Sequence, residues 1–86
     1  MTPPDDRTRR LGVVECFISV VNQCPSGAAR RVAENALAAV EREGAKALPE
    51  QAFLVLSAAR GWRGERAAQV QRSLEAFLAE GPRAPR

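Results

Sequence analysis

The two cysteines are the most chemically versatile side chains in this sequence, because a thiol can bind a metal or undergo oxidation. Cys16 and Cys24 could contribute to a metal site shared between two copies, or act as a redox sensor. On one continuous helix, eight residues would place their Cα atoms about 12 Å apart, whereas a disulfide spans at most roughly 7 Å. Structural zinc sites need four ligands, usually in closely spaced pairs. The spacing therefore predicts two free thiols, with Cys16 as a small core residue and Cys24 at a helix end.

The rest of the composition excludes most catalytic arrangements. The 86 residues include no His, so neither a Ser–His nor a Cys–His nucleophile can form. The one Lys, Lys46, falls in a predicted link, and paired glutamates such as Glu41 and Glu43 fall on solvent-facing helix ends. No glycine-rich loop stands between a strand and a helix, which removes the nucleotide-binding fingerprints. We therefore expect a protein that is not an enzyme and needs no metal or cofactor.

Apolar residues recur at helical spacing along most of the chain, and this predicts an all-α fold. The expected architecture is a compact four-helix bundle-like domain with short links, its helices at about 9–23, 27–43, 49–60 and 65–80. The boundaries follow from capping and breaking residues, namely Thr8, Pro25, Ser26, Gly44, Pro49, Gly61 and Gly81. Residues 1–7 are expected to be a disordered lead, residues 8–81 a single helical domain and residues 82–86 a frayed tail.

The first predicted helix is apolar around most of its circumference. Its polar residues Glu15, Ser19 and Asn22 are four and three positions apart, so they form one narrow stripe. Because β-branched residues are frequent here, a strand is the alternative, but the valine pairs at 13–14 and 20–21 break strict alternation. A helix of this kind is buried from several sides, so it is either the central helix or the one that meets a second chain.

The third predicted helix and the link after it carry the bulkiest side chains. The inner stripe of this helix is expected to comprise Ala52, Phe53, Leu56 and Ala59, broadened by Leu54 and Val55. Trp62 lies in the link between two glycines and beside arginines. It is either an anchor for a partner protein or a lid folded back on the bundle.

The net charge of +3 comes from the two ends of the chain. Residues 11–81 contain eight basic and eight acidic side chains, whereas arginines outnumber aspartates in the two terminal segments. A folded nucleic-acid-binding domain normally carries a basic face on its body, so the charge alone does not predict such a partner. The N-terminus lacks the organisation of a signal peptide, and the longest apolar-rich stretch, 11–21, is about half a membrane span. We expect a cytoplasmic protein with no membrane partner.

One segment nevertheless carries a pattern of DNA-binding proteins. It comprises Leu48-Pro49-Glu50, an apolar helix, Gly61-Trp62 and then Glu65-Arg66-Ala67-Ala68. This pattern resembles the opening of sigma-factor region 4, a helix-turn-helix module, over about a quarter of the chain. The resemblance implies a DNA-binding regulator that uses residues 48–77 and an arm at 7–10, with phosphate contacts from Arg60, Arg63, Arg66 and Arg72. In that family a second turn and a separate recognition helix should follow Val70, whereas here one helix is expected to continue to Phe77.

The small core is the strongest indication of a protein partner. Of 39 apolar residues, 16 are Ala, and a chain of this length draws only about 3–5 kcal/mol from its own core. We therefore expect a non-catalytic interaction module, an accessory subunit or adaptor, that packs a helix face against another chain in a homodimer or a heteromeric complex. The expected contact residues are Val13, Phe17, Val20, Trp62 and Arg63.

Overall fold

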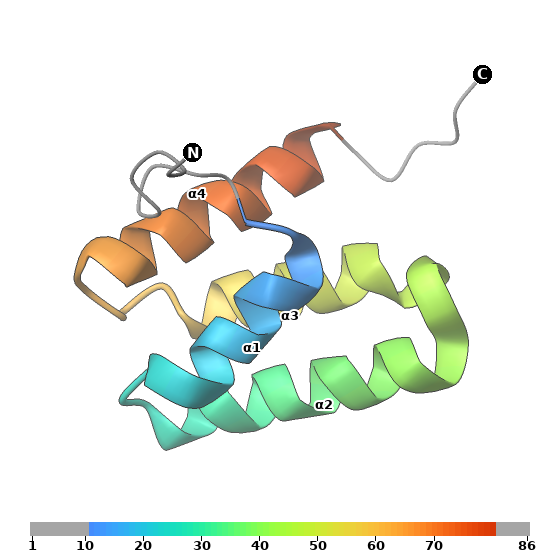
Figure 1. Ribbon diagram of the computed structural model, residues 1–86, viewed down its shortest axis with the longest axis horizontal. Helices are drawn as coiled ribbons and strands as arrows, with labels where there is room; N and C mark the ends of the chain where they lie inside the picture. Colours follow the sequence, from blue (N-terminus) through green and yellow to red (C-terminus); the bar gives the residue numbers. More distant parts are fainter. Residues whose placement is uncertain (1–10, 81–86) are drawn as a thin grey trace, which may run out of the picture.

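The computed structural model describes residues 11–80, which are folded as an all-α domain and confirm the predicted fold class. The elements are α1 (Val13–Gln23), α2 (Gly27–Glu43), the 3₁₀ helix η2 (Gly44–Ala47), α3 (Leu48–Ala58) and α4 (Glu65–Glu80). No loop separates α2, η2 and α3, so they form one bent helical path that folds back on itself (Figure 1). The Thr8 cap, the lead at 1–7, the arm at 7–10 and the tail at 82–86 lie outside the described residues.

The first helix begins at Val13, later than the predicted residue 9. Gly12 is the N-cap, and the carboxylate of Glu15 accepts a hydrogen bond from the Gly12 N–H (3.0 Å), which is one half of a capping box. The Leu11 N–H instead donates to Ser73 Oγ of α4 (2.9 Å). Leu11 continues the apolar pattern because it is buried although it precedes the helix, and periodicity alone cannot distinguish that burial from a helical turn.

The second helix has the predicted bounds and the predicted caps. Ser26 Oγ accepts from the Ala29 N–H (3.1 Å), and Gly44 ends the helix with a φ of 77°, in the left-handed region that favours glycine. Arg30 Nη1 donates to the carbonyl of Cys24 (2.8 Å) and so ties the end of α1 to the first turns of α2. The segment predicted as a short link remains helical as η2, which makes the bend tight.

The core lies where α1 packs against the other three α-helices. Phe17 and Val20 of α1 are fully buried there with Val55 of α3 and Leu74 of α4. The buried side of α2 is built from four alanines, Ala29, Ala33, Ala36 and Ala39, which allow its backbone to come close to its neighbours. The burial of α1 from several sides agrees with its apolar circumference.

The inner stripe of α3 differs from the predicted one. Ala52, Leu56 and Ala59 are buried as expected. The fourth buried residue of the stripe is Val55 rather than Phe53, which is 58% exposed. Each residue turns a helix by about 100°. Val55 and Ala59 therefore set the direction of the buried face, and Phe53 lies far to one side of it. Because apolar residues lie on both sides of this helix, the packing of the neighbouring helices determines which side is buried.

Candidate protein-interaction surface

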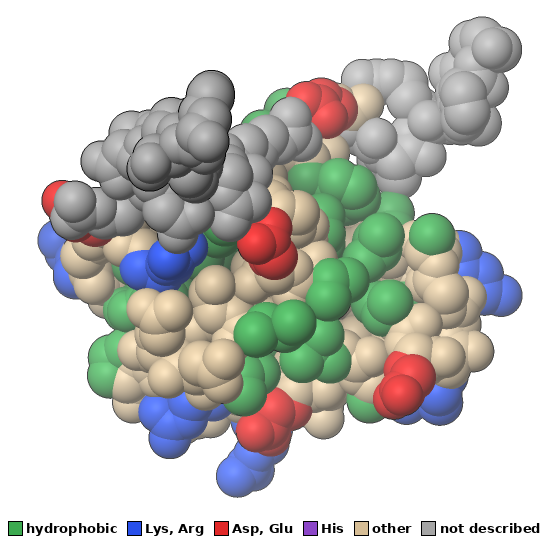
Figure 2. Space-filling view, viewed as in Figure 1, with side chains coloured by type: hydrophobic (Ala, Val, Ile, Leu, Met, Phe, Trp, Pro, Cys, Tyr) green, Lys and Arg blue, Asp and Glu red, His purple; other side chains and the backbone are tan. Residues whose placement is uncertain are grey.

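An apolar stripe runs along the outer side of α1. Val14 and Ile18, one helical turn apart, are 40% and 44% exposed, and half-buried Val21 extends the stripe by another turn. Figure 2 shows hydrophobic side chains gathered in a band on the face that α1 crosses, from over α1 and α2 toward the end where α2 bends into α3. Uncovered β-branched side chains on a central helix are the feature that a helix-packing partner would use.

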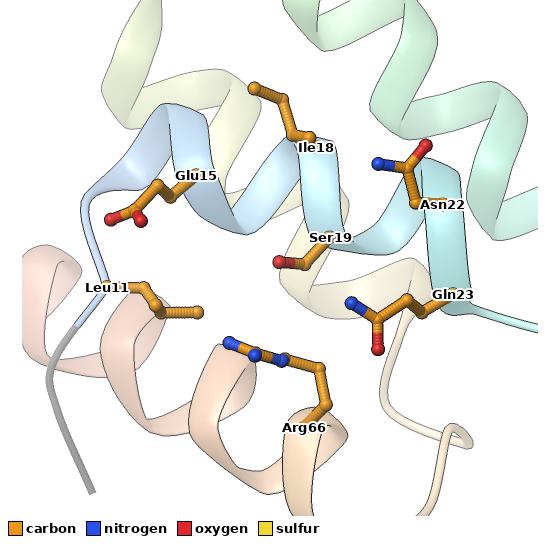
Figure 3. Close-up of a pocket in the computed structure, with 7 residues that line it drawn as sticks. All are labelled: Leu11, Glu15, Ile18, Ser19, Asn22, Gln23 and Arg66. Carbon is orange, nitrogen blue, oxygen red and sulfur yellow. The ribbon is translucent and has the colours of Figure 1, made fainter. Parts of the chain in front are cut away.

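A polar pocket lies directly beside this stripe, between α1 and α4 (Figure 3). Its volume is about 260 Å³, and its lining comprises Leu11, Glu15, Ile18, Ser19, Asn22, Gln23 and Arg66. Ser19 and Gln23 extend from α1 and Arg66 from α4 into the gap, whereas Ile18 and Asn22 point away from α4. The narrow polar stripe recognised in the sequence is therefore the α1 wall of a pocket, and Ile18 belongs to both features.

The pocket contains hydrogen-bonding side chains from both helices. Arg66 Nη1 donates to Oε1 of Gln69, a fully buried side chain of α4 (2.7 Å). Glu15 is held by the Gly12 N–H, so the carboxylate and the guanidinium are both positioned by the chain itself. The lining contains no thiol and no imidazole. An arrangement of this kind can receive a polar side chain or a water-mediated contact at the edge of an interface.

Neither thiol belongs to this surface. Cys16 and Cys24 are free, as predicted from their spacing, and both are buried. Cys16 Sγ donates to the Val70 carbonyl (3.8 Å), which places it against α4 in the core. Within residues 11–80, no cluster of three or more His, Cys, Asp or Glu side chains could hold a metal ion.

The five predicted partner contacts fall in different environments. Phe17 and Val20 are fully buried in the core, so a partner that leaves this fold intact does not reach them. Val13 is half-buried, and Arg63 is exposed. The outer side of α1 is instead formed by residues one position further along, Val14, Ile18 and Val21. Sequence periodicity predicted that α1 is apolar on several sides, but the positions of α2 and α4 decided which of these sides stays uncovered.

Trp62 is half-buried and packs against the core, which supports its role as a lid. The Gln71 side chain holds this turn from α4, because its Nε2 donates to the carbonyls of Ala59 (2.8 Å) and Trp62 (3.0 Å). Gly64 ends the turn with a φ of 117°, which only glycine adopts readily. A contact between Trp62 and a partner remains a prediction.

The four arginines of the DNA-binding alternative do not share one face. Arg66 points into the pocket on the α1 side of α4, while Arg60, in the turn after α3, pairs with Glu75 of α4 (4.0 Å). Nine residues separate Arg66 from Glu75, about two and a half turns, so these two contacts lie on opposite sides of α4. Arg63 and Arg72 are exposed. The fourth helix continues without a break through Arg72 to Glu80.

Comparisons of the chain with models of protein families, with curated proteins and with solved structures gave no significant match. Among residues 11–80, no helix is both long and apolar enough to cross a membrane.

Proposed function

We propose that this protein is a non-catalytic helical interaction module, an accessory subunit or adaptor, that binds another protein chain through the outer side of α1. The observation that carries this proposal is the stripe of Val14 and Ile18, each more than one third exposed on the helix that packs against all the others. Complete burial of such a side chain contributes about 1.5–3 kcal/mol, so covering the uncovered part contributes about 1 kcal/mol for each. Several contacts of this size would add substantially to the stabilisation that the small core provides.

The distribution of charge supports a protein partner over a nucleic acid. Residues 11–81 are neutral overall. The unbroken course of α4 also leaves no separate recognition helix in the described part of the chain. DNA binding through Arg60, Arg63, Arg66 and Arg72 would need one continuous basic face, and Arg60 and Arg66 lie on opposite sides of α4. These features favour helix-face packing as the function.

The test compares the wild-type chain with Ile18→Glu, which places a charge in the stripe, and with Ser57→Glu, which adds the same charge to exposed α3. Sedimentation velocity over a range of micromolar concentrations measures self-association, and capture from native extract measures binding to other chains. We expect association in wild type and Ser57→Glu, and its loss in Ile18→Glu. A concentration-independent monomer that captures nothing would contradict the proposal. Gel-shift binding at low salt would instead support the DNA-binding alternative.

A further inference from the structure

We propose that α4 is a lid that opens and closes as a unit, while α1, α2 and α3 stay folded against one another. The packing of the helices divides them in this way. Each of α1, α2 and α3 contacts the other two, whereas α4 contacts α1 and α3 and, among the described helices, not α2. Figure 1 shows α4 along the edge of the fold opposite α2. A helix at an edge can separate at a lower free energy than the whole domain unfolds. This motion goes beyond the proposed function and does not depend on it.

The buried side of α4 is only partly apolar. It comprises Ala67, Gln69, Val70, Ser73 and Leu74, with half-buried Phe77 and Leu78 further along the helix. Gln69 accepts a hydrogen bond from Arg66 within α4 itself, and Ser73 accepts one from the Leu11 N–H. Water can replace Ser73 as the acceptor when α4 leaves, so this bond holds the lid less firmly than a buried apolar contact would. The pocket of about 260 Å³ further reduces the packed surface between α1 and α4.

The turn before α4 supplies a hinge and a latch. Gly64 directly precedes the helix with a φ of 117°, and no described atom beyond its chain neighbours lies within 4 Å of the position that a Cβ would take. Its backbone can therefore rotate with little steric hindrance. Gln71 of α4 donates to the carbonyls of Ala59 and Trp62, which lie on the α3 side of Gly64. Rotation about Gly64 breaks both bonds, so Gln71 is the latch.

The two native thiols report on different motions. Cys16 Sγ donates to the Val70 carbonyl (3.8 Å), so α4 covers this thiol in the closed form. Cys24 lies at the junction of α1 and α2, where Arg30 of α2 binds its carbonyl (2.8 Å). Both residues are buried while the lid is closed. We expect the opening of α4 to expose Cys16 and to leave Cys24 covered.

Alkylation of the full chain with iodoacetamide, read by tandem mass spectrometry, measures the labelling rate of each thiol. In the wild type, Cys16 should be labelled at least about tenfold faster than Cys24, although both rates remain far below those in denaturant. Gln71→Ala removes the latch and should raise the Cys16 rate about tenfold. Arg72→Ala changes an exposed residue of the same helix and is the matched control, which should label like wild type.

Val32→Ala separates lid opening from global unfolding. Val32 is half-buried on α2, which α4 does not contact, so its truncation destabilises the open and closed forms equally. Global unfolding should become about fourfold more frequent, whereas the opening of α4 should not change. The Cys24 rate should therefore rise, and the Cys16 rate should stay at its wild-type value. Equal wild-type rates for the two thiols, or an equal rise of both in Val32→Ala, would overturn the proposal.

Native-state hydrogen exchange in increasing urea tests the lid in the wild type alone. A helix of 16 residues is marginal by itself, so the amides of α4 should exchange once it leaves. The Val70 and Leu74 amides should exchange faster than those of Ala33 and Ala36 in α2. Their rates should also depend less on urea, because lid opening exposes less surface than global unfolding. The same rate and the same urea dependence in both helices would show that α4 unfolds only with the whole domain.

Discussion

The side-chain amide of Gln71 donates a hydrogen bond to the carbonyl of Trp62 across the turn between α3 and α4 (3.0 Å). The same nitrogen reaches the carbonyl of Ala59 (2.8 Å). One side chain of α4 therefore bonds two backbone carbonyls of the segment that follows α3, and the Ala59 carbonyl also accepts from the Trp62 N–H (3.0 Å).

Replacing Gln71 by Ala should lower the free energy of unfolding by about 1–2 kcal/mol, because the Trp62 carbonyl loses the Gln71 donor and the Ala59 carbonyl keeps only the bond from the Trp62 N–H. Urea denaturation followed by far-UV circular dichroism measures this change. Arg72→Ala is the matched control, since Arg72 is exposed on the same helix and should change stability by less than about 0.5 kcal/mol. Equal stability of the two variants would show that the turn does not depend on Gln71.

Replacing Ser73 by Ala should also destabilise the protein, by about 1–2 kcal/mol, because the Leu11 N–H is left buried without an acceptor. Ser57→Ala removes the same hydroxyl from an exposed position of α3 and serves as the control. Native-state hydrogen exchange gives a residue-specific readout. The Leu11 amide should lose protection in Ser73→Ala alone, and retained protection would contradict the assignment.

Truncation of Phe17 should lower stability far more than truncation of Phe53. Phe17→Ala empties a fully buried site in the core and should cost about 3–5 kcal/mol, most of the stability of a chain this size. Phe53→Ala removes a side chain that is 58% exposed and should cost less than about 1 kcal/mol. Urea denaturation compares them directly, and a cooperative transition in Phe17→Ala near that of wild type would refute the described core.

The thiols of Cys16 and Cys24 should react slowly with a water-soluble disulfide reagent, because both lie in the core. Their rate should rise strongly in denaturant, where the thiols become accessible. Absorbance of the released thiolate reports both stages. Rapid labelling of the native protein would show that one of these sites opens without global unfolding, since reagents of this size do not enter a packed interior.

Much of the fold follows from local signals along the chain. Ser26 and Gly44 bound α2 where predicted, and the breakers between residues 59 and 64 separate α3 from α4, since caps and backbone preferences act within one or two turns. The spacing of the two cysteines likewise predicted that they stay free. The start of α1 was misplaced because the Leu11 N–H is bonded to a residue 62 positions away, which no local pattern records.

The sequence by itself determined the helical class, the position of most helices, the neutrality of the body and the presence of apolar residues around α1. Only the tertiary structure decided which of those residues remain uncovered, because an apolar circumference has no preferred side until α2, α3 and α4 are packed against it. Phe17 and Val20 are buried in the core, whereas Val14 and Ile18 remain exposed. The pocket arose in the same way: Glu15, Ser19 and Asn22 form a stripe in any helix, but Arg66 lies across the pocket from Ser19 only because α4 lies alongside α1.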